Sequence, residues 1–153
     1  MSAEIKTRSA AEVLGPGMWF MLEQQAFLAN TDEEKRAFIR FLKNTATYHP
    51  CHAECAKHSK EYIKMHPPEE WMKVFAPEGT PNGFLLYVVN MHNTVNLMKG
   101  VPEYDYRLVY RKHKTIYDRV AESSGGPVPC LDDGKCSKID QIGPLPPILT
   151  LLS

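Results

Sequence analysis

Two of the chain's four cysteines lie close together in a segment rich in histidine. This segment, residues 49–58, has the sequence HPCHAECAKH and places Cys51 and Cys55 four positions apart. In a helix, residues at this spacing have Cα atoms about 6 Å apart, which a disulfide can bridge. The helix dipole and the unpaired backbone N–H groups stabilise a thiolate at a helix N-terminus, so such a thiol exchanges readily. The pair is therefore suited to thiol–disulfide chemistry.

The same segment admits two other interpretations. Cysteine and histidine are zinc ligands, but structural zinc motifs bring ligand pairs together from separated parts of a chain. The second cysteine pair, Cys130 and Cys136, has five intervening residues that include Asp-Asp-Gly, outside the usual spacing of a zinc knuckle. The spacing thus favours redox chemistry over a zinc-binding adaptor. Two unreactive thiols stay possible, because a C-x-x-x-C spacing alone does not distinguish them.

A second group of polar residues lies on the apolar segment Phe84–Lys99, FLLYVVNMHNTVNLMK. His92, Asn96 and Lys99 are at positions i, i+4 and i+7, so they form one polar line along a helix that Gly100 ends. A lone histidine on such a helix is most often a core residue that a neighbour satisfies. The asparagine and lysine on the same line indicate a bound ligand instead.

Hydrophobic spacing predicts five helices joined by short loops, and no alternating strand pattern competes with them. A Gly-Pro-Gly turn at 15–17 is expected to open the first helix, and Thr31 and Glu34 have the spacing of a capping box for the second. The fold class is therefore all-α. The expected helices begin near Met18 and cover residues 30–44, 52–65, 84–99 and 102–121, with a proline-rich insertion at 66–83 that has at most one helical turn.

These residues occur in the order seen in a known family. GPGMW at 15–19, Pro-Cys at 50–51, HNTVN at 92–96, Lys99 and PEYDY at 102–106 resemble the Erv/ALR family of FAD-dependent sulfhydryl oxidases, over positions 15–113. The resemblance implies a four-helix bundle with a short fifth helix, FAD held in the bundle, and a homodimer. It also implies three segments: a loosely ordered N-terminus at 1–14, an FAD-binding oxidase domain at 15–121, and a flexible C-terminal segment at 122–153.

The resemblance further implies the reaction. Electrons pass from the dithiols of protein substrates through Cys51 and Cys55 to FAD and then to molecular oxygen, which becomes hydrogen peroxide. Cys51 receives the electrons and Cys55 faces the flavin. Cys130 and Cys136 are expected to be a shuttle pair, with a local staple of the tail as the alternative. The residues implied in cofactor binding are Trp19, Glu23, Tyr48, His92, Asn93, Val95, Asn96, Lys99 and Tyr104, and no metal site is expected.

Three features depart from the family pattern. The cysteine pair has three intervening residues where the family has two, and Glu23 stands where the family has a histidine. The family's structural cysteines align with Val89 and Tyr106, so their disulfide is absent. This loss fits members encoded by large DNA viruses as readily as cellular ones. The altered spacing keeps open a catalytically degenerate helical module that serves in protein interactions.

Charge and hydropathy restrict the partners and the compartment. The 18 Lys and Arg residues balance 18 Asp and Glu residues, which argues against nucleic acid as a partner. The chain opens without a long apolar run, and its apolar end, LPPILTLLS, is too short to span a bilayer. These features predict an intracellular, cytoplasmic protein without a membrane span, located in the host cytoplasm or the virion if the chain is viral.

Overall fold

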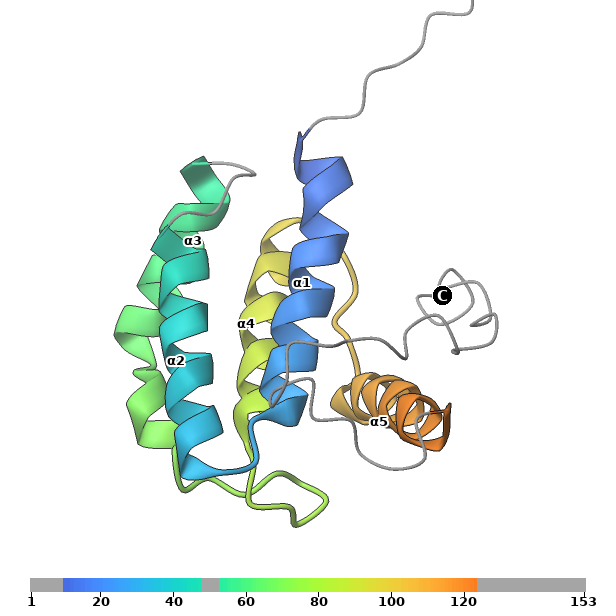
Figure 1. Ribbon diagram of the computed structural model, residues 1–153. Coiled ribbons are helices and arrows are strands. Elements are labelled where there is room, and N and C mark those ends of the chain that lie inside the picture. Colours follow the sequence, from blue (N-terminus) through green and yellow to red (C-terminus); the bar gives the residue numbers. More distant parts are fainter. Residues whose placement is uncertain (1–9, 48–52, 124–153) are drawn as a thin grey trace, which may run out of the picture. The chain divides into compact units, whose positions relative to one another are not determined.

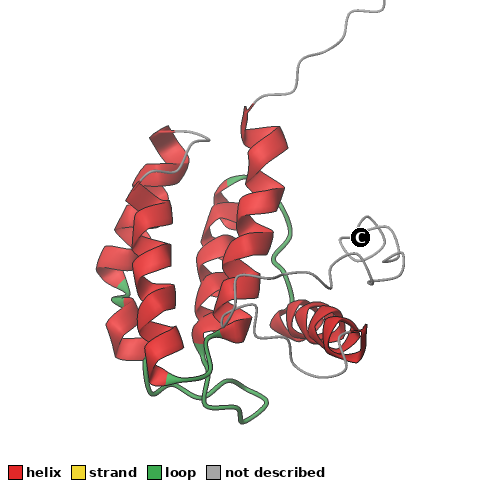
Figure 2. Cartoon of the chain, in the orientation of Figure 1, coloured by secondary structure: helices red, strands yellow, loops and turns green. Residues whose placement is uncertain are grey.

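A computed structural model of the chain describes residues 10–47 and 53–123. The described residues are helical and contain no strand, which confirms the all-α fold class (Figures 1 and 2). The chain divides into two compact units between Tyr106 and Arg107. The helices are α1 (Ala10–Leu28), α2 (Asp32–Thr47), α3 (Ala53–Met65), the 3₁₀ turn η1 (Pro68–Trp71), α4 (Phe84–Met98) and α5 (Tyr106–Ser123).

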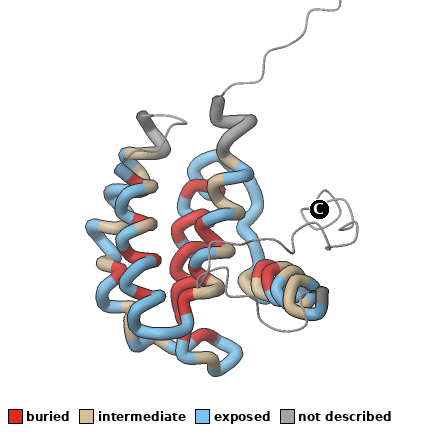
Figure 3. The backbone as a smooth tube through the Cα atoms, in the orientation of Figure 1, coloured by how far each residue is buried: buried red, intermediate tan, exposed pale blue. Residues whose placement is uncertain are grey.

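Helix α4 is the central element of the first unit. It packs against α1, α3 and η1, while α2 packs against α1 and α3. Buried positions follow α4 along its length, as Figure 3 shows. The apolar run that predicts this helix is nearly continuous because neighbours cover several of its faces. Its buried apolar residues are Phe84, Leu85, Tyr87, Val88, Val89, Met91 and Val95.

The start of α1 differs from the sequence expectation. The Gly-Pro-Gly turn predicted at 15–17 is wrong, because α1 begins at Ala10 and continues through Pro16. A proline removes one backbone hydrogen bond, but its fixed φ is compatible with a helix. The segment before it, Ala10-Ala11-Glu12, consists of good helix formers. The expected segments 1–14 and 122–153 lie largely outside the described residues, so their looseness stays a prediction.

The capping box of α2 is confirmed. The Thr31 Oγ1 atom accepts a hydrogen bond from the Glu34 backbone N–H at 3.2 Å, and Glu34 Oε2 accepts from the Thr31 N–H at 2.9 Å. Glu34 Oε2 also accepts from the Asn30 N–H at 2.9 Å. The backbone N–H of Thr31, followed by that of Asn30, lowers the pKa of the Glu34 carboxyl. After this capping box, α2 buries Phe38, Ile39 and Leu42.

Asn82 joins the end of α1 to the beginning of α4. Its Nδ2 donates to the Ala26 carbonyl at 2.9 Å and to the Phe27 carbonyl at 3.3 Å. Its Oδ1 accepts from the Phe84 N–H at 3.0 Å, which is the bond of an Asx turn. One buried amide thus serves both helix ends, so it helps set the axial register of α1 against α4.

Two other buried polar groups hold the connection between α3 and α4. The Lys35 Nζ donates to the carbonyls of Met72 and Pro81, at 2.9 and 2.5 Å. The hydroxyl of Tyr87 donates to the His66 carbonyl at 2.7 Å, just past the end of α3. These bonds fasten the proline-rich insertion to α2 and α4. The insertion contains one helical turn, η1, which agrees with the expectation of at most one.

Helix α4 ends where its sequence predicts. Gly100 has a φ of 65°, the left-handed conformation that closes a helix, and the Val101 N–H donates to the Asn96 carbonyl at 2.9 Å. α5, described by itself, begins at Tyr106, four residues later than expected, and has 18 residues. Val109 and His113 of this helix are buried. Within the described parts of the chain, no helix has the length and apolar character needed to cross a membrane.

Candidate functional site

Three aromatic rings meet between α1 and the end of α4. The Trp19 ring of α1 stacks on the His92 ring of α4, with centroids 3.9 Å apart and planes only 3° from parallel. The ring of Tyr104 approaches His92 edge-on, with centroids 4.8 Å apart and planes 67° apart. Tyr104 is 48% exposed and Trp19 is partly exposed, so this ring cluster reaches the surface. The packing of α1 on α4, together with the segment that follows α4, therefore brings together three residues that the resemblance places at a cofactor.

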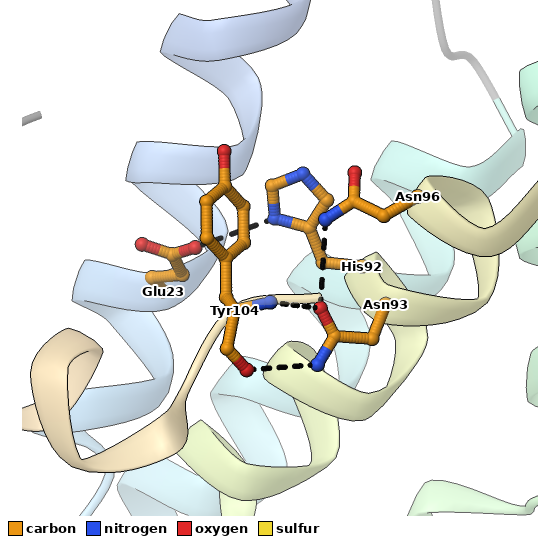
Figure 4. Close-up of polar contacts among 5 residues, drawn as sticks. All are labelled: Glu23, His92, Asn93, Asn96 and Tyr104. Atoms are coloured by element: carbon orange, nitrogen blue, oxygen red, sulfur yellow. Dashed lines mark hydrogen bonds and ion pairs between the residues drawn. The ribbon is translucent and has the colours of Figure 1, made fainter. Parts of the chain in front are cut away.

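A buried carboxylate faces the middle ring of this cluster. Figure 4 shows Glu23 of α1 directed at His92, with 3.5 Å between Glu23 Oε1 and His92 Nδ1. Glu23 is 3% exposed and His92 is 8% exposed. A carboxylate only accepts hydrogen bonds, so it favours the ring tautomer with its proton on Nδ1. This leaves His92 Nε2 as the atom that can accept a hydrogen bond from a ligand.

The Nδ1 atom of His92 is incompletely satisfied. Among the described residues, it is the buried side-chain nitrogen that lacks a hydrogen-bond partner, because the contact with Glu23 is too long or poorly aligned. Burying a polar atom without a partner costs about 1–3 kcal/mol.

The two asparagines of the HNTVN segment behave differently from each other. The Asn93 Nδ2 donates to the Tyr104 carbonyl at 3.0 Å, and Asn93 Oδ1 accepts from the Tyr104 N–H at 2.8 Å (Figure 4). The Asn96 side chain is buried, and its Nδ2 lies 3.5 Å from Asn93 Oδ1. Asn93 therefore binds the chain itself, whereas Asn96 makes only a long contact and is better placed for a ligand.

The remaining residues of the polar line have distinct environments. Lys99 is exposed at the end of α4, one turn after Asn96, as the i, i+4, i+7 spacing predicts. Val95 is buried among the core residues of α4. The ammonium of Lys99 can neutralise an anionic group bound along the same face of α4.

The structure describes the backbone of one of the four cysteines. Cys55 lies in the first turn of α3, which begins at Ala53, so the backbone of this residue is at a helix N-terminus. Cys51, Tyr48, Cys130 and Cys136 lie outside the described residues. Their roles, and the side-chain position of Cys55, stay predictions.

Sequence reasoning missed two features of this region. It did not foresee that Asn93 binds the backbone of Tyr104, because no local pattern links these two positions. It also missed Asn82, although Asn-Gly directly before an apolar helix is a recognisable signal for an Asx turn. Asn82 acts at a distance from the ring cluster, by holding the helices that carry Trp19 and His92.

A family model described as Erv1 / Alr matches residues 17–117, which is more than half of the chain. The chain belongs to the Erv1/Alr family. Members of this family are typically FAD-linked sulfhydryl oxidases. No curated protein and no solved structure matches the chain. The Erv1/Alr match contains the ring cluster, Cys51 and Cys55, and it ends before Cys130 and Cys136.

Proposed function

We propose that this Erv1/Alr protein is an FAD-dependent sulfhydryl oxidase that forms disulfides in protein substrates. Family membership supports the reaction class. The observation that carries the proposal is the stack of Trp19 on His92 beside the edge of Tyr104, on the helix that also bears Asn96 and Lys99. This arrangement combines flat surfaces, a buried polar edge and a cation, which are the groups that a flavin dinucleotide needs.

The residues fit FAD in three respects. Trp19, His92 and Tyr104 offer ring surfaces for a planar cofactor, and His92 Nε2 can accept a hydrogen bond from it, because Nδ1 faces Glu23. The Asn96 amide is buried with one long contact, so it can bind a polar edge of the cofactor. The Lys99 ammonium is exposed on the same helix and can offset the pyrophosphate charge.

The chain's own chemistry is thiol–disulfide exchange at Cys51 and Cys55. A substrate thiolate attacks the Cys51 sulfur of the oxidised pair, which forms a mixed disulfide and releases Cys55 as a thiolate. The second substrate thiolate then attacks the substrate sulfur of this mixed disulfide, so the substrate disulfide leaves and Cys51 is released as a thiolate. When bound, FAD supplies the acceptor that takes the two electrons from the cysteine pair and the donor that passes them, with two protons, to oxygen.

The position of Cys55 in the first turn of α3 supports its role as the leaving thiolate. The unpaired backbone N–H groups of that turn and the helix dipole stabilise negative charge there. A thiolate that is stabilised in this way leaves faster in exchange. Cys51, two residues before α3, is assigned to receive the substrate.

The second cysteine pair is assigned to electron delivery. Cys130 and Cys136 follow the Ser-Ser-Gly-Gly-Pro segment at 123–127, a composition typical of flexible linkers. A tethered dithiol raises the local concentration of thiol at the active pair, whether it acts in its own subunit or in the partner of a homodimer. Loss of this pair should slow the oxidation of protein substrates more than that of a small dithiol.

Purified protein provides the test. We expect a yellow sample that contains FAD and consumes oxygen in the presence of a small dithiol, with hydrogen peroxide as the product. Cys55→Ala should retain the flavin and lose turnover, whereas the matched variant Cys136→Ala should retain activity on the small dithiol. Full dithiol oxidase activity in Cys55→Ala would exclude this mechanism. A colourless protein that releases zinc would indicate an adaptor, and a colourless protein without metal would indicate an interaction module.

A further inference from the structure

Asn93 is one of the residues of the HNTVN segment that sequence reasoning assigns to the cofactor, yet its amide is already engaged. Both of its polar atoms bind one residue of the same chain, with Nδ2 donating to the Tyr104 carbonyl at 3.0 Å and Oδ1 accepting from the Tyr104 N–H at 2.8 Å. The Oδ1 atom also lies 3.5 Å from Asn96 Nδ2. An amide oxygen has two lone pairs, so these contacts leave only one N–H of the amide uncommitted.

The bonds from Asn93 hold a reversal of the chain. After α4, Gly100 takes a φ of 65° and the Val101 N–H donates to the Asn96 carbonyl at 2.9 Å. The chain then returns along α4, so that Tyr104 lies beside Asn93 and not beyond the helix end (Figure 4). The segment 100–104 has no regular structure of its own. The Asn93 amide is thus a main source of its fixed position.

Holding the Tyr104 backbone also places its ring. The Tyr104 ring lies edge-on against His92, which in turn stacks on Trp19. The Tyr104 side chain is 48% exposed, so packing from other residues restrains it only in part. Without the bonds from Asn93, an exposed aromatic side chain on an irregular segment would sample several orientations.

We propose that Asn93 is a positioning residue that controls cofactor retention through Tyr104, without contacting the cofactor. The inference rests on the proposed function, since it concerns the FAD site. Asn93 and Tyr104 act together. The side-chain amide of Asn93 fixes the backbone of Tyr104, and the Tyr104 ring closes the open edge of the ring cluster. Removing either half therefore has the same consequence for the ligand.

The first experiment needs no cofactor. Hydrogen exchange of the Tyr104 amide, measured by NMR on the cofactor-free full chain, should be at least about tenfold faster in Asn93→Ala than in wild type. Asn90→Ala is the matched control, because it makes the same change at an exposed position one turn earlier on α4. It should leave the Tyr104 amide unchanged. Equal exchange in Asn93→Ala and wild type would overturn the inference, and protected core amides in α4 would show that the variant is folded.

The second experiment is a double-mutant cycle on flavin release. Asn93→Ala and Tyr104→Ala should each increase the rate of FAD dissociation by about tenfold, and the double variant should be no faster than Tyr104→Ala alone. Effects that multiply in the double variant would mean that Asn93 contacts the ligand independently, which contradicts the inference.

The two readouts separate the two proposals. If wild type binds no flavin although the Tyr104 amide depends on Asn93, the proposed function fails and the contact between Asn93 and Tyr104 stands. If wild type binds flavin and Asn93→Ala releases it at the wild-type rate, the positioning role fails and the proposed function stands.

Discussion

Replacing Asn82 by alanine should loosen the junction that keeps α1 in register with α4. The Asn82 side chain is 6% exposed and bridges the two helix ends, with Nδ2 on the carbonyls of Ala26 and Phe27 and Oδ1 on the Phe84 N–H. Alanine removes all of these bonds at once. The Phe84 N–H, one of the orphan donors at the start of α4, then loses its acceptor in a buried place.

The size of the effect follows from two terms. Asn82 precedes the N-cap Gly83, and loss of its bond to the buried Phe84 N–H costs about 1 kcal/mol. Loss of the bond to the Ala26 carbonyl adds about 1–1.5 kcal/mol, since that carbonyl is buried but keeps a weaker contact with the Ala29 N–H at 3.3 Å. The expected loss is about 2–2.5 kcal/mol, which for a unit of this size lowers Tm by roughly 10–20 °C.

Urea unfolding followed by far-UV circular dichroism measures this change in the free energy of unfolding. Asn44→Ala is the control, because Asn44 is exposed on α2 and alanine is the better helix former. That variant should be neutral or slightly stabilised. Asn82→Asp keeps the acceptor for the Phe84 N–H but places a carboxylate oxygen against the Ala26 carbonyl, so it should be at least as destabilised as Asn82→Ala if the link to α1 matters.

Ordinary surface substitutions change the free energy of unfolding by less than about 0.5 kcal/mol. A change this small in Asn82→Ala would refute the idea that Asn82 joins α1 to α4. An unstable Asn82→Ala together with a fully stable Asn82→Asp would show that only the bond to the Phe84 N–H matters. In that case the link to α1, and with it the role of Asn82 in the register of Trp19 and His92, would be wrong.

Three further predictions concern Gly83 before α4, Glu34 at the start of α2 and Tyr87 on α4. Gly83→Ala should lower the free energy of unfolding in urea by about 1–3 kcal/mol, because a Cβ there would lie 2.8 Å from Val74 Cγ1 and 3.0 Å from the Val74 carbonyl oxygen. An unchanged free energy of unfolding would mean that the loop containing Val74 adapts freely. Glu34→Gln should keep the capping box but lose its pH dependence. The pKa of Glu34 is lowered in the fold, so the carboxylate contributes stability above its ordinary value of 4.5 and loses it as pH falls through the folded pKa; the advantage of wild type over the variant should shrink in acid. Burial, followed by the nearby Tyr62 and Glu69, raises the pKa of Tyr87, so its protonated hydroxyl contributes fully to stability below the ordinary pKa of 10.0 and less as pH rises above it. Tyr87→Phe should lower the free energy of unfolding by about 1 kcal/mol at neutral pH, and this free energy should fall less steeply with rising pH than in wild type. An unchanged dependence on pH in alkali would contradict this.

Local signals in the sequence were enough for most of the helices. Thr31 and Glu34 predicted the cap of α2, and Gly100 predicted the end of α4, because each depends on backbone geometry within a few residues. The Gly-Pro-Gly turn failed for the opposite reason. Its residues are compatible with both a turn and a helix, so local propensity does not determine that α1 extends back to Ala10.

The candidate site divides in the same way. The HNTVN segment indicated the family and placed His92, Asn96 and Lys99 on one helix face, which is a consequence of helical periodicity alone. The stack of Trp19 on His92 and the bonds of Asn93 to Tyr104 came only from the folded chain. Such contacts depend on how α1 packs on α4 and on where an irregular segment returns, and these are set by the summed burial of many residues that no short pattern encodes.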